Sequence, residues 1–174
     1  MDKNIVLDNI NNHEYYSENM EVFRMIDETS MKILKILQEK ARIPNVEVAR
    51  QVGMAPSAVL ERIRKLEKLG YIDGYEVRLN PEKFGRSLVA FVQVTVQQSA
   101  REHAVGKKLA AIPEVLEVHF VTGDDGYLVK LRAADARSLG SLVQSKIARL
   151  PHVIATRTVV AMSTLKETWR IPIE

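Results

Sequence analysis

Arginine, lysine and small polar side chains gather between residues 45 and 69, and they are the side chains in this sequence best suited to specific chemistry. Arginine and lysine neutralise phosphates, arginine also donates to guanine edges, and glutamate accepts from the amino group of cytosine. Serine and alanine are short enough to let a helix approach DNA closely. This stretch therefore predicts contact with double-stranded DNA through Arg50, Ser57, Ala58, Glu61, Arg62, Arg64, Lys65 and Lys68.

The candidates divide by the kind of contact that each side chain can make. We expect Arg62 or Arg64 to donate to guanine or phosphate, and Glu61 to accept from cytosine. Phosphate contacts position a protein without specifying sequence. The residues best placed for them are Arg50, Lys65 and Lys68. The alternative is a small three-helix module whose basic face is merely solvated, since charged helix faces are common.

Three helices are expected to position these side chains. The first is capped by Asp27 and ends before Pro44, because the residue preceding a proline is pushed out of the helical region. The second is short, is capped by Asn45 and is followed by a sharp turn at Gly53. The third covers 56–69 and opens with a proline, whose missing N–H costs nothing there. A short helix, a tight turn and a longer helix predict a helix-turn-helix, whose second helix enters the major groove.

Apolar spacing predicts which side of each helix faces the core. In the third helix Val59, Ile63 and Leu66 recur at helical spacing and should be buried. In the second helix the inward residues are expected to be Val46, Val48, Ala49 and Val52. After the helices, Asp73-Gly74 predicts a β-hairpin, which would make the domain winged-helix-like.

The second half of the chain changes from helical to alternating periodicity. The stretch 88–96 predicts a strand whose even-numbered residues share one face. The segments 112–116 and 150–154 echo one another, each closing a helix and opening a strand. The remaining expected elements are helices over 101–111 and 135–149, and strands over 115–121, 127–132 and 153–162.

Two β-α-β halves in tandem predict an α+β domain of ferredoxin-like βαββαβ topology, with both helices on one face of an antiparallel sheet. No further element is left to cover the other face, so self-association is expected. Trp169 and Ile171 near the C-terminus are expected to pack on a partner or on the sheet edge.

Composition excludes several classes of protein and site. The absence of cysteine excludes disulfides, thiolate metal sites and cysteine nucleophiles. No signal-peptide pattern occurs and no apolar run approaches the ~20 residues of a membrane span, so we expect a soluble cytoplasmic protein with no membrane partner. His119 shares a strand face with Glu117 and is expected to face solvent or an interface. Neither a catalytic group nor a metal or cofactor site is expected.

The ordered motifs of the helical region resemble those of the Lrp/AsnC family, also called feast/famine regulators. They are Asp27 with Lys35-Ile36-Leu37-Gln38, then Val48 through Val59, then Arg62 through Tyr75. The resemblance runs from Ile26 to roughly Lys166. It implies a sequence-specific regulator of transcription with an N-terminal helix-turn-helix and a C-terminal ferredoxin-like domain. That second domain would form dimers, often octamers, and bind a small-molecule effector, commonly an amino acid.

Composition and periodicity, with Pro81 and Gly85 marking the linker, predict the domain boundaries. We expect a tail over 1–25, a helix-turn-helix domain over 26–80, a linker over 81–86, a ligand-sensing and oligomerisation domain over 87–165 and a C-terminal end over 166–174.

The loop that contributes to the family's effector pocket departs from the family pattern. It corresponds to Thr122, Gly123, Asp124, Asp125, Gly126, Tyr127 and Leu128. The family commonly has an aromatic residue where Asp125 stands and an aspartate where Gly126 stands. Three interpretations are open: Asp124 or Asp125 supplies the charge for an amino acid's ammonium group from a shifted position, the ligand is a different molecule, or the protein has no ligand. A plain β-turn explains the composition of this loop equally well.

Two other functions remain open from the sequence. Siroheme decarboxylase subunits share the two-domain plan, so architecture alone does not exclude an enzyme. A ligand-sensing or interaction protein that has lost DNA affinity is the other alternative.

Overall fold

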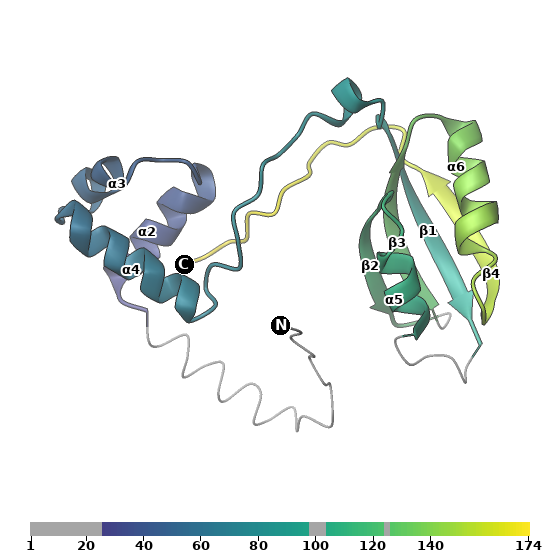
Figure 1. The fold of residues 1–174 in the computed structure, drawn as a ribbon, viewed down its shortest axis with the longest axis horizontal. Helices are drawn as coiled ribbons and strands as arrows, with labels where there is room; N and C mark the ends of the chain where they lie inside the picture. The colour runs from purple at the N-terminus through teal and green to yellow at the C-terminus, as the bar shows by residue number, and fades with distance from the viewer. Residues whose placement is uncertain (1–25, 98–103, 124–125) are drawn as a thin grey trace. The chain divides into compact units, whose positions relative to one another are not determined.

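The computed structural model describes residues 26–97, 104–123 and 126–174. The chain forms two compact units (Figure 1). The first contains the described residues up to Val77 together with Thr168–Glu174, and the second contains Arg78–Glu167. The chain therefore passes between the units twice. The expected tail over 1–25 lies outside the described residues.

The first unit is built on three helices, α2 (Glu28–Glu39), α3 (Asn45–Val52) and α4 (Pro56–Lys68). Asp27 caps α2 as predicted, because its carboxylate accepts from the backbone N–H of Ser30 at 2.7 Å. One face of each helix enters a shared core. The core residues are Ile33, Leu37, Val48, Ala49, Val59, Ile63 and Leu66. The predicted burial of Val59, Ile63 and Leu66 is therefore confirmed.

The predicted start and inward face of α3 were partly wrong. Pro44, not Asn45, occupies the N-cap position, and no side chain caps this helix. Val48 and Ala49 are buried as expected, but Val46 is 67% exposed. At 3.6 residues per turn, Val46 lies roughly 110° from the centre of the face formed by Val48, Ala49 and Val52, so it cannot share that face.

The predicted hairpin at Asp73-Gly74 is also wrong, since no strand forms over 71–80. A tight hairpin of this kind needs positive φ at its central residues. Gly74 does not have it, whereas Gly70 does, at φ 78° directly after α4. Past 71–80, a short 3₁₀ helix, η1 (Pro81–Phe84), precedes the second unit's sheet.

The second unit is a four-stranded antiparallel sheet in the order β2-β3-β1-β4. Its strands are β1 (Leu88–Val96), β2 (Val115–Val121), β3 (Gly126–Ala133) and β4 (Val153–Val160). Its helices are α5 (Ala104–Ala110) and α6 (Ala136–Leu142), the latter continued by a π-helical turn, η3 (Val143–Ile147). This element order confirms the βαββαβ prediction. Of the helix expected over 101–111, residues 101–103 lie outside the described residues.

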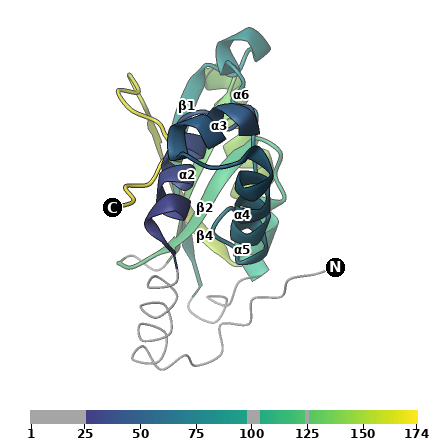
Figure 2. The same ribbon diagram turned by 90° about the vertical axis from the view of Figure 1, so that its left-hand side faces the viewer.

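The helices cover one face of the sheet (Figures 1 and 2). The buried members of that layer include Val92 and Val94 of β1, Val105 of α5 and Leu139 of α6, so the alternation predicted for β1 is confirmed. No described helix covers the opposite face. That face presents the register neighbours Phe91 and Val159, together with Leu128, all of them exposed apolar side chains.

Candidate nucleic-acid interface and effector loop

The α3–turn–α4 geometry is set by two local signals. Gly53 ends α3 in the left-handed conformation, at φ 70°, and its N–H donates to the Ala49 carbonyl. Pro56 then opens α4, where its fixed φ suits the first helical position. A short helix, a sharp glycine turn and a longer helix are the parts of a helix-turn-helix.

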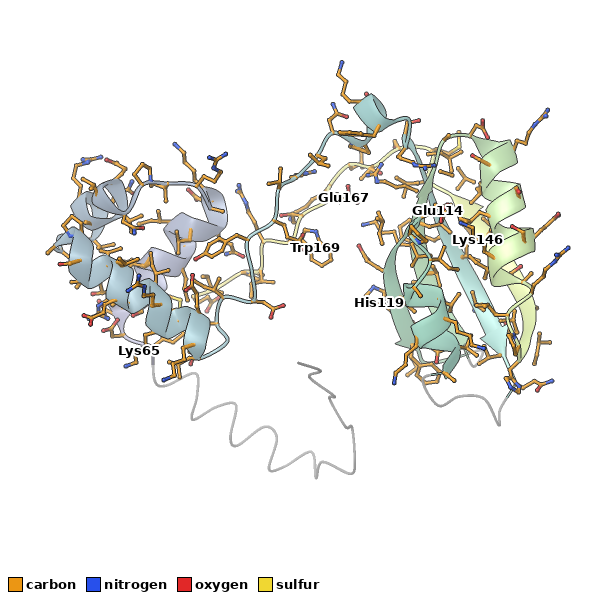
Figure 3. The ribbon with its side chains drawn as sticks, viewed as in Figure 1. Lys65, Glu114, His119, Lys146, Glu167 and Trp169 are labelled. Atoms are coloured by element: carbon orange, nitrogen blue, oxygen red, sulfur yellow. The ribbon has the colours of Figure 1, made fainter. Side chains whose placement is uncertain are left out.

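Burial of one stripe of α4 decides what the helix presents to solvent. Measured round the helix from the centre of that stripe, Glu61, Arg64 and Lys65 lie at about 130–170°. These side chains are exposed, and Lys65 extends from the helix in Figure 3. Ser57 and Lys68 are exposed on the same side. All the predicted DNA-contacting residues of α4 except Ala58 and Arg62 thus share one solvent-facing surface.

Ala58 and Arg62 are the two that lie on the flank of α4. Both are half-buried. The guanidinium of Arg62 pairs with the Asp27 carboxylate, and the same Nη1 donates to the Ser30 hydroxyl at 3.0 Å. The Ser30 backbone N–H and the Arg62 guanidinium lower the pKa of Asp27 to about 2. The sequence identified Asp27 as a helix cap, but not as the partner of Arg62.

Arg50 is engaged too, though on an open surface. Its guanidinium pairs with Glu47 at 2.6 Å, and Gln51 donates to the same carboxylate. The hydrogen bonds from Arg50 and Gln51 lower the pKa of Glu47 to about 2. Exposed ion pairs of this type contribute little to stability. Arg50 can therefore exchange Glu47 for a phosphate at small cost.

The predicted effector loop joins β2 to β3. Thr122 and Gly123 follow β2, whereas Asp124 and Asp125 lie outside the described residues. Gly126, Tyr127 and Leu128 open β3. Because side chains alternate along a strand, Tyr127 enters the helix-covered core while Leu128 faces the opposite side of the sheet. The described members of this set therefore do not converge on one side.

Tyr127 is the polar side chain of this loop that the structure buries. It is 3% exposed, and its ring meets the Phe120 ring edge-on with centroids 5.3 Å apart. Gly106 of α5 leaves the space that the ring occupies, since a Cβ there would lie 2.8 Å from Tyr127 Cε1. Among the described residues, the Tyr127 hydroxyl has no hydrogen-bond partner. Buried hydroxyls ordinarily have one, so this group keeps an unused donor and acceptor in the structure.

Gly126 explains part of the departure from the family loop. A Cβ at this position would overlap the Val94 carbonyl oxygen and lie 2.9 Å from the Val94 carbonyl carbon. The β1–β3 pairing is thus too close for any side chain here. An aspartate, common in the resembling family at this position, does not fit this backbone.

Charged side chains form a chain of ion pairs on the sheet face opposite the helices. Lys130 contacts Glu117 and Glu167, each at 2.7 Å, and Arg132 contacts Glu167 at 2.9 Å. His119 is exposed and lies 3.2 Å from Glu117, in agreement with the expected solvent- or interface-facing histidine. In the parts of the chain that the structure describes, no three acidic or histidine side chains group as a metal site would need.

The C-terminal residues make contacts that the sequence did not suggest. The Gln38 side chain binds the backbone of Ile171 twice, accepting from its N–H at 2.6 Å and donating to its carbonyl at 3.0 Å. Arg170 donates to the Glu39 carbonyl at the end of α2. The side chains of Trp169, labelled in Figure 3, and Ile171 are themselves exposed, and their packing on a partner or on the sheet edge stays a prediction. Backbone recognition by a glutamine leaves no pattern in sequence.

No helix in the described ranges is long and apolar enough to cross a membrane.

Comparison with known proteins agrees with both units. A family model described as the Lrp/AsnC ligand binding domain matches residues 89–171, and one described as a winged helix-turn-helix DNA-binding domain matches residues 26–73. The leucine-responsive regulatory proteins of Escherichia coli K12 and Klebsiella pneumoniae are each 37% identical to this chain over 151 residues, covering 86% of it and 92% of the relative.

Solved structures show the same likeness. A transcriptional regulator from Neisseria meningitidis in complex with L-methionine matches with a TM-score of 0.81 at 28% identity, over 85% of this chain and 97% of the other. A feast or famine regulatory protein from M. tuberculosis complexed with L-methionine matches with a TM-score of 0.77 at 31% identity, over 83% of this chain and 97% of the other. These relatives are named as regulators, which favours regulation over the siroheme decarboxylase alternative. The chain belongs to the Lrp/AsnC family of DNA-binding transcriptional regulators.

Proposed function

We propose that this regulator reads its operator with the solvent-facing surface of α4 and changes its DNA affinity or assembly when an amino acid binds. The observation that carries the DNA-binding half is the placement of Glu61, Arg64 and Lys65 on the side of α4 opposite its buried stripe. Arginine and glutamate there are suited to base edges, and lysine to phosphates. The protein would act in the cytoplasm and not as an enzyme.

Self-association supplies the second recognition helix. The uncovered sheet face carries exposed apolar side chains, including Phe91 and Val159, which a second copy would bury. A symmetric dimer would present its two α4 helices to half-sites about one DNA turn, ~34–36 Å, apart. Further assembly, up to an octamer as in many family members, would add avidity by engaging adjacent sites.

Two observations support an amino-acid effector near the β2–β3 loop. The matched family model is that of a ligand-binding domain, and two of the structural relatives are complexes with L-methionine. The buried Tyr127 hydroxyl, unpartnered among the described residues, is a polar group that a ligand can satisfy. Leucine and methionine are therefore the first amino acids to test.

The experiment is a gel-shift titration on the intergenic DNA upstream of the protein's own gene. Each titration is run at two salt concentrations, with and without leucine, methionine or a pool of the twenty amino acids. A discrete shift that weakens with salt is expected, because phosphate contacts release counterions. Binding no tighter than to unrelated DNA would refute the regulator, and an unchanged shift with every amino acid would refute the effector.

A further inference from the structure

Arg62 differs from the other basic residues of α4 in what its side chain does. Its guanidinium reaches across to α2, where it pairs with the Asp27 carboxylate and donates to the Ser30 hydroxyl. The Asp27 carboxylate in turn accepts a hydrogen bond from the backbone N–H of Ser30, at 2.7 Å. Ser30 is itself buried. One arginine therefore ties α4 to the capping residue and the first turn of α2.

The position of Arg62 round the helix agrees with this role. It lies roughly 70° from the centre of the buried stripe of α4, whereas Glu61 and Arg64 lie at more than about 130°. Helices α2 and α4 are neighbours within the first unit (Figure 2). Ile33 of α2 and Val59 and Ile63 of α4 belong to their common core. Apolar packing permits small rotations of one helix against another. A directional, charge-assisted pair at the edge of the contact restricts them.

We propose that Arg62 is a positioning residue: by bridging Asp27 and Ser30 it sets the orientation of α4 against α2, and it does not contact DNA. This inference rests on the proposed DNA recognition by α4 and revises the sequence-based expectation that Arg62 reads guanine or phosphate. Base reading then falls to the opposite surface of the helix, with Ser57, Glu61 and Arg64.

The sign of one substitution separates the two roles. Asp27→Asn keeps a good helix cap but removes the carboxylate charge that holds Arg62. If Arg62 were a DNA contact held back by Asp27, the substitution would free it and remove a negative charge, so binding would tighten. If Arg62 positions α4, operator affinity should fall, by up to about fivefold, because a pair worth about 1 kcal/mol can change the free energy of binding by no more than that amount.

Glu28→Gln is the matched control. It removes the same charge from the next residue, in the first turn of α2, where no ion pair with Arg62 exists. Glu28→Gln should leave affinity unchanged or raise it slightly, because only a long-range repulsion from the phosphates is lost. If Asp27→Asn and Glu28→Gln changed operator affinity in the same direction and by the same factor, the proposal would be overturned.

The salt dependence of operator binding gives a second, independent readout. Arg62→Met should weaken binding while leaving the slope of log K against log salt at the wild-type value, since no phosphate contact is lost. Lys65→Met should lower the magnitude of that slope by about 0.9, the value for one phosphate. Fluorescence anisotropy with a labelled operator measures both, and thermal unfolding checks that each variant is folded.

The outcomes are distinct. A slope reduced by Arg62→Met as much as by Lys65→Met, or an unchanged affinity of that variant, overturns the positioning role alone. Failure of the wild-type protein to bind any operator overturns DNA recognition by α4 and, with it, this proposal. If Arg62→Met does not fold, Asp27→Asn, which keeps the cap, decides the question.

Discussion

Replacing Gly126 with alanine should destabilise the second unit strongly. The added Cβ would overlap the Val94 carbonyl oxygen and lie 3.1 Å from the Thr95 Cα. Both neighbours are backbone atoms of the paired strand β1, so neither can rotate away as a side chain would. Overpacking in cores costs about 1–3 kcal/mol, and a backbone obstacle places this case at the upper end of that range.

Gly140→Ala is the matched control, with an effect of opposite sign. Gly140 lies within α6, and a Cβ there would meet nothing within 4 Å. Because alanine loses less backbone freedom in a helix than glycine, this variant should be more stable by about 0.5–1 kcal/mol. The same chemical change is thus expected to act in opposite directions at two positions of one unit.

Thermal unfolding followed by far-UV circular dichroism measures both effects. Protein concentration must be held constant, because the midpoint of an assembly depends on it. For a domain of this size, each kcal/mol moves the midpoint by about 4–8 °C. Gly126→Ala should therefore lower it by about 10 °C or more, and Gly140→Ala should raise it by a few degrees. A Gly126→Ala protein that unfolds at the wild-type temperature would refute the close approach of β1 and β3.

Three further predictions test the sites. Tyr127→Phe should leave the unliganded protein as stable as the wild type, or more stable by about 1 kcal/mol, because it removes a buried hydroxyl without a described partner. The same variant should bind the amino acid more weakly in calorimetric titration, and unchanged binding would place the effector elsewhere. The pKa of Asp27 is lowered from 3.8 to about 2 in the folded state, so its stabilisation is present above pH 3.8 and is lost as pH falls towards 2. Acid unfolding of Asp27→Asn should accordingly lack part of the wild-type decline in that window, and identical curves would exclude the contribution. Gln38→Ala should speed amide exchange at Ile171, whose N–H donates to Gln38, whereas Gln51→Ala should not; equal protection in both variants would argue against this contact.

The sequence by itself determined the elements whose signals are local. Helical spacing placed Val59 and Ile63 in a core, and alternation over 88–96 assigned the buried face of β1, because each periodicity follows from the geometry of a single element. Asp27 was identifiable as a cap for the same reason, since its partner Ser30 lies three residues away. The echo between the two halves of the second unit then predicted its βαββαβ element order, which the structure confirms.

Tertiary structure alone decided the contacts between residues distant in sequence. Arg62 meets Asp27 across 35 positions, and Gln38 meets Ile171 across 133. Neither pair follows a spacing that any single helix or strand imposes. The predicted hairpin at Asp73-Gly74 failed because composition permits a turn but does not determine the φ angle that a hairpin requires. Which arginine of α4 faces solvent and which ties two helices together depends on where α2 packs, and only the folded unit specifies that.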